Sequence, residues 1–319
     1  MVAARHLLGL EPLGAAEIGR LLDRAAVLKA AIGTPEGAAH TLRGQLVANL
    51  FFEPSTRTRS SFEIAARCLG AQVLNWTVAG SSASKGETFL DTARNLAAMR
   101  PAALVVRHAA AGAPQLLAAR LDCPIVNAGD GAHEHPSQGL LDAFTLRERW
   151  GDLVGRTVAI VGDIARSRVA RSNLHCLPKL GARVRLCGPP TMLPRELAAI
   201  APGVELCSKL EDAIRGADAV MLLRIQLERQ EKGEAPLFPS LAEYSRLYGL
   251  GARSAAFLAP DALILHPGPV NRGVELSAEL ADGPRSVILD QVENGVAVRM
   301  AILEGLIVGA VGLREGARA

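Results

Sequence analysis

The sequence predicts an α/β fold with two doubly wound parallel-sheet domains joined by interdomain helices. Short apolar runs alternate with segments of helical periodicity along most of the 319 residues, a rhythm typical of parallel sheets with crossover helices. The rhythm restarts after a long helical pattern over 135–150 that ends at Gly151. We therefore expect one domain at 1–150 and a second at 151–286. A final apolar helical pattern begins near Val287 and suits either domain by periodicity; we assign 287–319 to the first.

The individual elements follow from apolar periodicity and from the turn residues between them. The expected strands are Leu46–Phe52, Ala71–Trp76, Ala103–Arg107, Pro124–Asn127, Thr157–Val161, Arg183–Cys187, Ala219–Leu223 and Ala262–Leu265. The expected helices are Ala15–Ile32, Ser60–Leu69, Glu87–Met99, Pro114–Leu121, His135–Trp150, Ser167–Leu180, Arg195–Ile200, Leu210–Arg215 and Val287–Val308. The polar segment 230–239 contains glycine and prolines and is expected to be a loop.

Composition excludes several classes of protein. The 35 basic and 32 acidic residues give a net charge of +3 without long like-charge runs, and aromatic residues make up only 3% of the chain. Both observations argue against a nucleic-acid partner. The five cysteines are scattered without a C-x-x-C pair, which favours reduced thiols. With no secretory leader pattern and no apolar run long enough to span a bilayer, we expect a soluble, cytoplasmic protein without a membrane partner.

The residues Glu53–Arg59, here called the anion turn, join an expected strand to an expected helix. Free N–H groups at a helix N-terminus and the helix dipole favour a bound anion. The turn adds the hydroxyls of Ser55, Thr56 and Thr58, and Arg57 adds a planar guanidinium that suits phosphate. Any one of these residues could simply cap the helix or be solvated. Their concentration at one strand–helix junction predicts a phosphate site.

Polar side chains follow the other expected strands as well. Ligands of open α/β sheets bind beyond the carboxyl ends of the strands, so these residues should face a common site. They are Arg107 and His108; Asp130, His133, His135 and Gln138; Asp163, Arg166 and Arg168; Arg224 and Gln226; and His266, Pro267, Gly268 and Pro269.

This collection is rich in arginine and lacks a conspicuous acid–base pair or nucleophile. Such a site acts by positioning and by electrostatic stabilisation. It suggests transfer of a group carried on phosphate to an acceptor that carries carboxylates. His133 and His135 could be read as a metal pair, but no third ligand has suitable spacing, and we expect neither a metal nor a cofactor.

Three motifs resemble the signatures of the aspartate/ornithine carbamoyltransferase family, in the same order and over nearly the whole chain. They are Ser-Thr-Arg-Thr-Arg at 55–59, His-Pro-Ser-Gln at 135–138 and His-Pro-Gly-Pro at 266–269. The loop 81–88 resembles the lysine-bearing loop of the aspartate-type members, and Arg224-Ile225-Gln226 resembles their Arg-x-Gln element. Pro267 stands where ornithine-type members place a cysteine. A second stretch, His175-Cys176-Leu177-Pro178, spells the ornithine-type tetrapeptide, but its helical spacing predicts a structural role.

The resemblance implies a carbamoyl phosphate domain at 1–150, an aspartate domain at 151–286, and transfer of the carbamoyl group to aspartate in pyrimidine synthesis. It implies that carbamoyl phosphate is bound by Ser55, Thr56, Arg57, Thr58, Arg107, His135, Gln138, Gly268 and Pro269. Within this set, Arg57, Thr58, Arg107 and His135 would be catalytic. Aspartate would be bound by Lys85, Arg168, Arg224 and Gln226.

The resemblance also implies a homotrimer, because Ser81 and Lys85 would reach the site of a neighbouring subunit. It leaves higher assemblies with dihydroorotase or with regulatory chains open. Glu53 would pair with Arg168 and Arg229 on domain closure, and the Gly268–Pro269 peptide is a candidate cis bond. Two alternatives stay open: transfer to ornithine or a related acceptor, and a non-catalytic scaffold.

Overall fold

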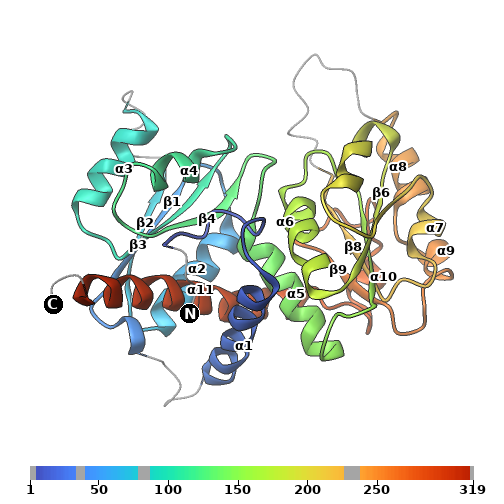
Figure 1. Cartoon of the computed structure of the whole chain (residues 1–319). Helices are drawn as coiled ribbons and strands as arrows, with labels where there is room; N and C mark the ends of the chain where they lie inside the picture. The colour runs from blue at the N-terminus through green and yellow to red at the C-terminus, as the bar shows by residue number, and fades with distance from the viewer. Residues whose placement is uncertain (1–4, 34–39, 78–86, 226–237, 317–319) are drawn as a thin grey trace. The chain divides into compact units, whose positions relative to one another are not determined.

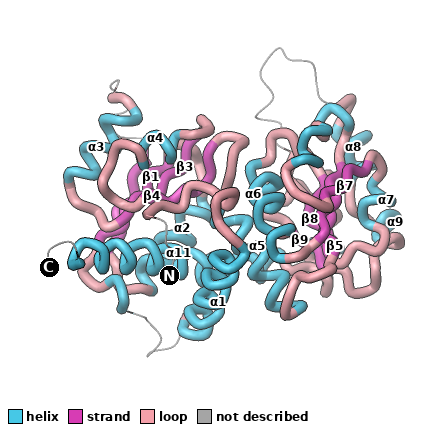
Figure 2. Tube along the Cα trace, viewed as in Figure 1, coloured by secondary structure: helices cyan, strands magenta, loops and turns pink. Residues whose placement is uncertain are grey.

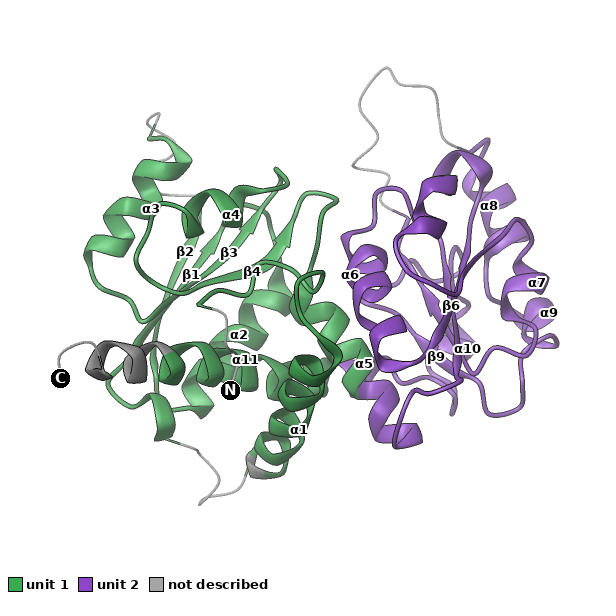
Figure 3. Cartoon of the chain, viewed as in Figure 1, with its two compact units in different colours: residues 1–144, 292–319 green, residues 145–291 purple. Residues whose placement is uncertain are grey.

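The computed structural model describes residues 5–33, 40–77, 87–225 and 238–316. The chain divides into two compact units, residues 1–144 with 292–319 and residues 145–291 (Figure 3). We call these unit 1 and unit 2. The chain passes from one unit to the other inside two helices, α5 (Pro136–Trp150) and α11 (Ile288–Gly316). The unit boundaries therefore fall within helices, whereas the sequence analysis placed them at helix ends.

Unit 1 contains a four-stranded parallel sheet with the order β2-β1-β3-β4. Its strands are β1 (Leu46–Phe51), β2 (Gln72–Thr77), β3 (Ala103–His108) and β4 (Ile125–Asp130). The helices of this unit are α1 (Ala15–Ala31), α2 (Thr56–Cys68), α3 (Phe89–Ala98) and α4 (Ala113–Ala118), with parts of α5 and α11 and the short 3₁₀ helix η1 (His40–Leu42). The inner strands β1, β3 and β4 are almost wholly buried, as expected of a sheet covered on both faces.

Unit 2 contains a five-stranded parallel sheet with the order β7-β6-β5-β8-β9. Strands of this sheet are labelled in Figures 1 and 2. Its strands are β5 (Thr157–Val161), β6 (Arg183–Cys187), β7 (Val204–Cys207), β8 (Ala219–Leu222) and β9 (Leu263–Leu265). Its α-helices include α6 (Arg168–Cys176), α7 (Leu210–Ile214), α8 (Leu241–Tyr248), α9 (Ala252–Ala255) and α10 (Ala278–Ala281). The 3₁₀ helices are η3 (Pro178–Leu180), η4 (Pro190–Met192) and η5 (Arg195–Ala199).

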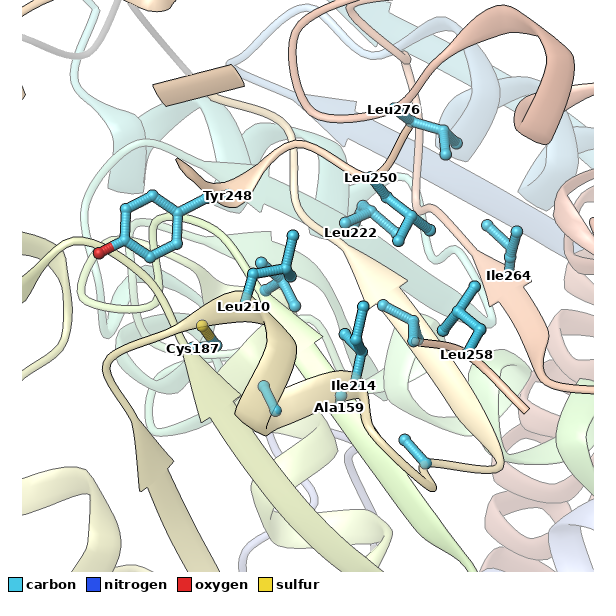
Figure 4. Close-up of a cluster of buried hydrophobic side chains, with 14 of the residues drawn as sticks. Ala159, Cys187, Leu210, Ile214, Leu222, Tyr248, Leu250, Leu258, Ile264 and Leu276 are labelled. Carbon is cyan, nitrogen blue, oxygen red and sulfur yellow. The ribbon is translucent and has the colours of Figure 1, made fainter. Parts of the chain in front are cut away.

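The core of unit 2 is mainly aliphatic, with three aromatic side chains, Phe238, Tyr244 and Tyr248. Side chains of β5, β6 and β8 pack against α7 and the segment that follows α8 (Figure 4). Ala159, Ile214, Leu222 and Ile264 are each fully buried in this cluster. Burying a side chain of leucine or isoleucine size contributes roughly 1.5–3 kcal/mol, so such a core stabilises the sheet that presents the polar strand ends.

The expected fold class is confirmed by the two parallel sheets, and several local expectations need correction. Helix α2 begins at Thr56, not at Ser60, so most of the anion turn is the first helical turn itself. Strand β4 extends to Asp130. The segment 195–199 is a 3₁₀ helix. The strand Val204–Cys207 was not predicted, because it is a short edge strand with only partly buried side chains.

The helices α8, α9 and α10 were also not predicted. Among the described residues, none of the helices combines the length and apolar character needed to cross a membrane.

Candidate active site

The anion turn lies at the carboxyl end of β1, as the sequence predicted. Ser55 is the N-cap residue of α2, with extended backbone angles, and its side chain makes no capping hydrogen bond to the helix. Thr56 and Arg57 are exposed, whereas Thr58 is buried. A hydroxyl, an exposed guanidinium and the first N–H groups of a thirteen-residue helix are thus gathered at one point. This arrangement suits a phosphate group.

Arg107 lies at the end of β3, the strand next to β1, and pairs in register with Phe51. Its guanidinium Nε is 3.6 Å from Oε2 of Glu53, and its Nη1 donates to the carbonyl of Ala128 at 3.3 Å. Both side chains of this ion pair are mostly buried. The pair holds Arg107 beside the anion turn and lowers the cost of burying its charge.

His135 and Gln138 follow β4 and lie at the start of α5. His135 is buried, and its Nδ1 lies 3.5 Å from the hydroxyl of Ser137. The side-chain amide of Gln138 donates from Nε2 to Oδ1 of Asp142 at 2.8 Å. Since β1, β3 and β4 are consecutive in the sheet, the polar residues at their three carboxyl ends belong to one edge of unit 1.

A buried carboxylate supports the segment between β4 and His135. Asp130 accepts hydrogen bonds from Asn127 Nδ2 at 2.7 Å and from the Gly112 amide at 2.8 Å, and its oxygens lie 3.1 Å from His133 Nδ1. Burial raises the pKa of Asp130, but these hydrogen bonds outweigh it, and the net pKa is below the ordinary value. His133 therefore faces a carboxylate.

Glu134 ties the same segment to the N-terminal part of the chain. Its carboxylate is buried and accepts from the Leu10 amide at 2.9 and 3.0 Å, and from the Glu11 amide at 3.4 Å. A Cβ atom at Gly9 would lie 2.3 Å from Oε1 of Glu134, so a larger residue there would force the carboxylate to shift. These contacts fix the backbone immediately before His135.

In unit 2, arginines follow two adjacent strands. Arg168 is the first residue of α6, after β5, and is 5% exposed. Arg224 follows β8, which pairs with β5 in parallel, and is partly buried. The hydroxyl of Ser167 accepts from the Ala170 amide at 3.1 Å and caps α6. Two guanidinium groups at neighbouring strand ends are suited to a ligand with more than one carboxylate.

The segment after β9 is held by a buried histidine. The Gly268–Pro269 peptide bond is cis, as the sequence analysis predicted. The Gly268 amide donates to Nδ1 of His266 at 2.8 Å, so His266 carries its proton on Nε2, which lies 3.2 Å from Oε1 of Glu275. Oε1 of Glu275 also accepts from the backbone N–H of Asn271 at 2.6 Å.

The side chain of Asn271 connects this segment to β8. Its Nδ2 donates to the carbonyl of Ile225 at 3.2 Å. Because Ile225 follows Arg224 directly, the loop that contains Gly268 is joined to the segment after β8 that contains Arg224.

An aromatic cluster beside the anion turn was not predicted. The ring of Phe52 lies 4.6 Å from Trp76, 5.0 Å from Phe89 and 5.3 Å from His108, between ring centroids. These rings come from the ends of β1, β2 and β3 and from the start of α3. These partly buried rings place an aromatic cluster beside the polar strand ends of unit 1.

Four predicted site residues, Ser81, Lys85, Gln226 and Arg229, lie outside the described residues. The ornithine-type tetrapeptide at 175–178 has the structural character that was expected. Cys176 ends α6 and is fully buried, as is Leu177.

Comparison with known proteins decides the family. The description "Aspartate/ornithine carbamoyltransferase, carbamoyl-P binding domain" matches residues 5–148, and "Aspartate/ornithine carbamoyltransferase, Asp/Orn binding domain" matches residues 154–306. The chain belongs to the aspartate/ornithine carbamoyltransferase family. Within this family it is 60% identical over 316 residues to an aspartate carbamoyltransferase catalytic subunit from Anaeromyxobacter sp. (strain K), covering 99% of this chain and 98% of the relative.

Solved structures of the carbamoyltransferase family have the same fold. The aspartate transcarbamoylase from Trypanosoma cruzi, in complex with carbamoyl phosphate and aspartate, is 29% identical with a TM-score of 0.85, over 94% of this chain and 96% of that one. The ornithine carbamoyltransferase from Thermus thermophilus is 28% identical with a TM-score of 0.83, over 96% and 100%. The fold is therefore common to aspartate- and ornithine-specific members, and the site residues must identify the acceptor.

Proposed function

We propose that this chain transfers the carbamoyl group of carbamoyl phosphate to the amine of L-aspartate, giving N-carbamoyl-L-aspartate and phosphate in pyrimidine synthesis. The relative at 60% identity is named for this activity. The observation that carries the proposal is the pair of arginines, Arg168 and Arg224, at the ends of the adjacent strands β5 and β8. A dicarboxylate is attracted by this pair, whereas the side-chain ammonium of ornithine is repelled.

Carbamoyl phosphate would be held by unit 1 through the anion turn, with its phosphate at the N-terminus of α2. We assign Ser55, Thr56, Arg57 and Thr58 to the phosphate. Arg107 would contact both the phosphate and the carbonyl oxygen. The amide oxygen of Gln138 would accept from the carbamoyl NH₂ group. In unit 2, we assign backbone groups near Gly268 and Pro269 to the same substrate.

The reaction needs stabilisation of a tetrahedral oxyanion. Thr58, Arg107 and His135 are the donors that we assign to this oxygen, and a well-aimed donor contributes roughly 3–4 kcal/mol to such a transition state. The aspartate nitrogen attacks the carbamoyl carbon, the bond from that carbon to the phosphate oxygen breaks, and the departing phosphate accepts the amine proton. No protein base is needed for this step.

The aspartate carboxylates would be bound by Arg168, Arg224, Gln226 and Lys85. In the proposed homotrimer, Ser81 and Lys85 come from a neighbouring subunit. The mass of the particle, measured by sedimentation equilibrium, tests this assembly: a monomer at assay concentrations would contradict it. The same measurement with added dihydroorotase or regulatory chains tests the higher assemblies. The five free cysteines support a reducing cytoplasm as the compartment.

The acceptor is tested by supplying carbamoyl phosphate with either aspartate or ornithine and following phosphate release and carbamoylated product. We expect turnover with aspartate alone. Turnover with ornithine would assign the chain to the other branch of the family, and absence of turnover with both would favour a scaffold.

The variant Arg224→Ala sharpens this test. Loss of a charge-assisted hydrogen bond costs about 1.5–3 kcal/mol, so the KM for aspartate should rise about 10- to 150-fold, while the KM for carbamoyl phosphate changes little. The exposed Arg195 in unit 2 provides the matched control, Arg195→Ala, for which both constants should stay unchanged. If Arg224→Ala and Arg195→Ala raised the KM for aspartate equally, the assignment of Arg224 to the aspartate carboxylates would be contradicted.

A further inference from the structure

A buried arginine of the C-terminal helix contacts the helix that begins at the anion turn. Arg299, in α11, is 3% exposed. Its Nη1 donates to the hydroxyl of Ser61 at 3.1 Å and to the carbonyl of Gly295 at 2.9 Å. Its guanidinium lies over the ring of Phe62, 5.1 Å from the centroid. Ser61 and Phe62 belong to α2, so Arg299 fixes the helix whose first turn would bind phosphate.

A buried carboxylate of α5 fixes the amide of Gln138. Asp142 is fully buried and lies one helical turn after Gln138, whose Nε2 donates to it at 2.8 Å. An ionised carboxylate can only accept, so the NH₂ group of Gln138 must face Asp142. The amide oxygen is then directed away from Asp142. This is the orientation in which Gln138 can accept from a carbamoyl NH₂ group.

Asp142 and Arg299 are electrostatic neighbours. Burial lowers the pKa of Arg299 to about 10, and the charge of Asp142 partly offsets this effect. The guanidinium therefore remains protonated at neutral pH. A buried carboxylate is costly unless its charge is compensated, and the protonated Arg299 contributes to that compensation.

Gly295 makes room for this arrangement. A Cβ atom at Gly295 would lie 2.4 Å from Nη1 of Arg299, 3.3 Å from Cδ2 of Leu141 and 3.6 Å from the Ser61 hydroxyl. Groups from α2, α5 and α11 therefore converge at one glycine. These three helices are far apart in the sequence, and two of them, α2 and α5, begin at or directly beside residues assigned to the carbamoyl phosphate site.

We propose that Asp142 and Arg299 are positioning residues for carbamoyl phosphate. Asp142 holds the amide of Gln138 in the orientation that accepts from the carbamoyl group. Arg299 compensates the charge of Asp142 and anchors α2 at the same point. This inference rests on the proposed function of Gln138 and of the anion turn. The competing explanation is that Asp142 and Arg299 contribute only to the stability of the core.

A double-mutant cycle separates the two explanations. In Asp142→Asn the side-chain amide of Gln138 is free to flip, so that its oxygen and nitrogen exchange places. We expect kcat/KM for carbamoyl phosphate to fall about 10- to 150-fold, in line with loss of a charge-assisted hydrogen bond. In a Gln138→Ala background the same substitution should change kcat/KM less than about twofold, because Asp142 acts through Gln138. An equal factor in both backgrounds would overturn the proposal.

The outcome is distinguishable from failure of the proposed function. If the unmodified chain does not carbamoylate aspartate, the function is wrong. If it does and the cycle is additive, only the positioning role is wrong.

A second variant covers the case in which Asp142→Asn does not fold. Alanine in place of a helical glycine ordinarily stabilises a helix, and Gly19→Ala in α1, where a Cβ meets nothing within 4 Å, serves as the control. Gly295→Ala should instead displace the guanidinium. We expect weaker binding of carbamoyl phosphate by calorimetry in Gly295→Ala and unchanged binding in Gly19→Ala. Unchanged binding in both would overturn the proposal.

Discussion

Glu275 should be essential for the stability of unit 2. Its carboxylate is fully buried, and Oε1 accepts from Nε2 of His266 and from the amide of Asn271. The substitution Glu275→Ala leaves both donors without this acceptor. Each buried donor that loses its partner costs about 1–3 kcal/mol, so for the two donors together we expect the free energy of unfolding to fall by about 2–6 kcal/mol.

Urea denaturation followed by circular dichroism measures this loss. The control is Glu196→Ala, an exposed carboxylate of unit 2, which should change the free energy of unfolding by less than about 0.5 kcal/mol. Glu275→Gln keeps an acceptor oxygen and should recover most of the stability. A loss below about 1 kcal/mol in Glu275→Ala, or no recovery in Glu275→Gln, would refute the reasoning, because the two hydrogen bonds would then contribute little.

Three further outcomes follow from unit 1. His135→Ala should lower kcat about 10²–10³-fold in steady-state assays; a loss confined to KM would contradict an oxyanion role. Glu53→Ala, which tests the proposed role in domain closure, should weaken aspartate binding more than carbamoyl phosphate binding; the reverse would assign Glu53 to its ion pair with Arg107. The lowered pKa of Asp130 contributes stability that is present above the ordinary aspartate pKa of about 3.9 and is lost as the pH falls through the folded value. In Asp130→Asn the free energy of unfolding should therefore depend less steeply on pH in the acid range. An unchanged dependence would contradict a lowered pKa of Asp130.

Elements that depend on a short continuous stretch of sequence could be predicted. The apolar runs of 46–52, 103–107 and 157–161 located central strands, because strands buried on both faces read as continuous hydrophobic segments. The polar residues at their ends could be collected without coordinates, because ligands of parallel sheets bind beyond the carboxyl ends of the strands.

Other features depend on contacts between distant segments and could not be read from periodicity. Asp142 lies in the helical pattern 135–150 like any acidic residue of a surface helix, and Arg299 interrupts an apolar helix without an evident reason. Their roles emerge only when α2, α5 and α11 are seen together. The edge strand β7 was missed for a different reason: alternation over four residues is too short a signal.

The division of the chain also determines the order in which its parts can be completed during synthesis. Unit 2 is continuous, whereas unit 1 requires both 1–144 and 292–319. All of unit 2 is therefore translated before Arg299. The anion turn is among the first segments translated, yet the cation that anchors its helix is among the last. A chain that terminates early near 291 would possess every strand of both sheets but would lack this anchor.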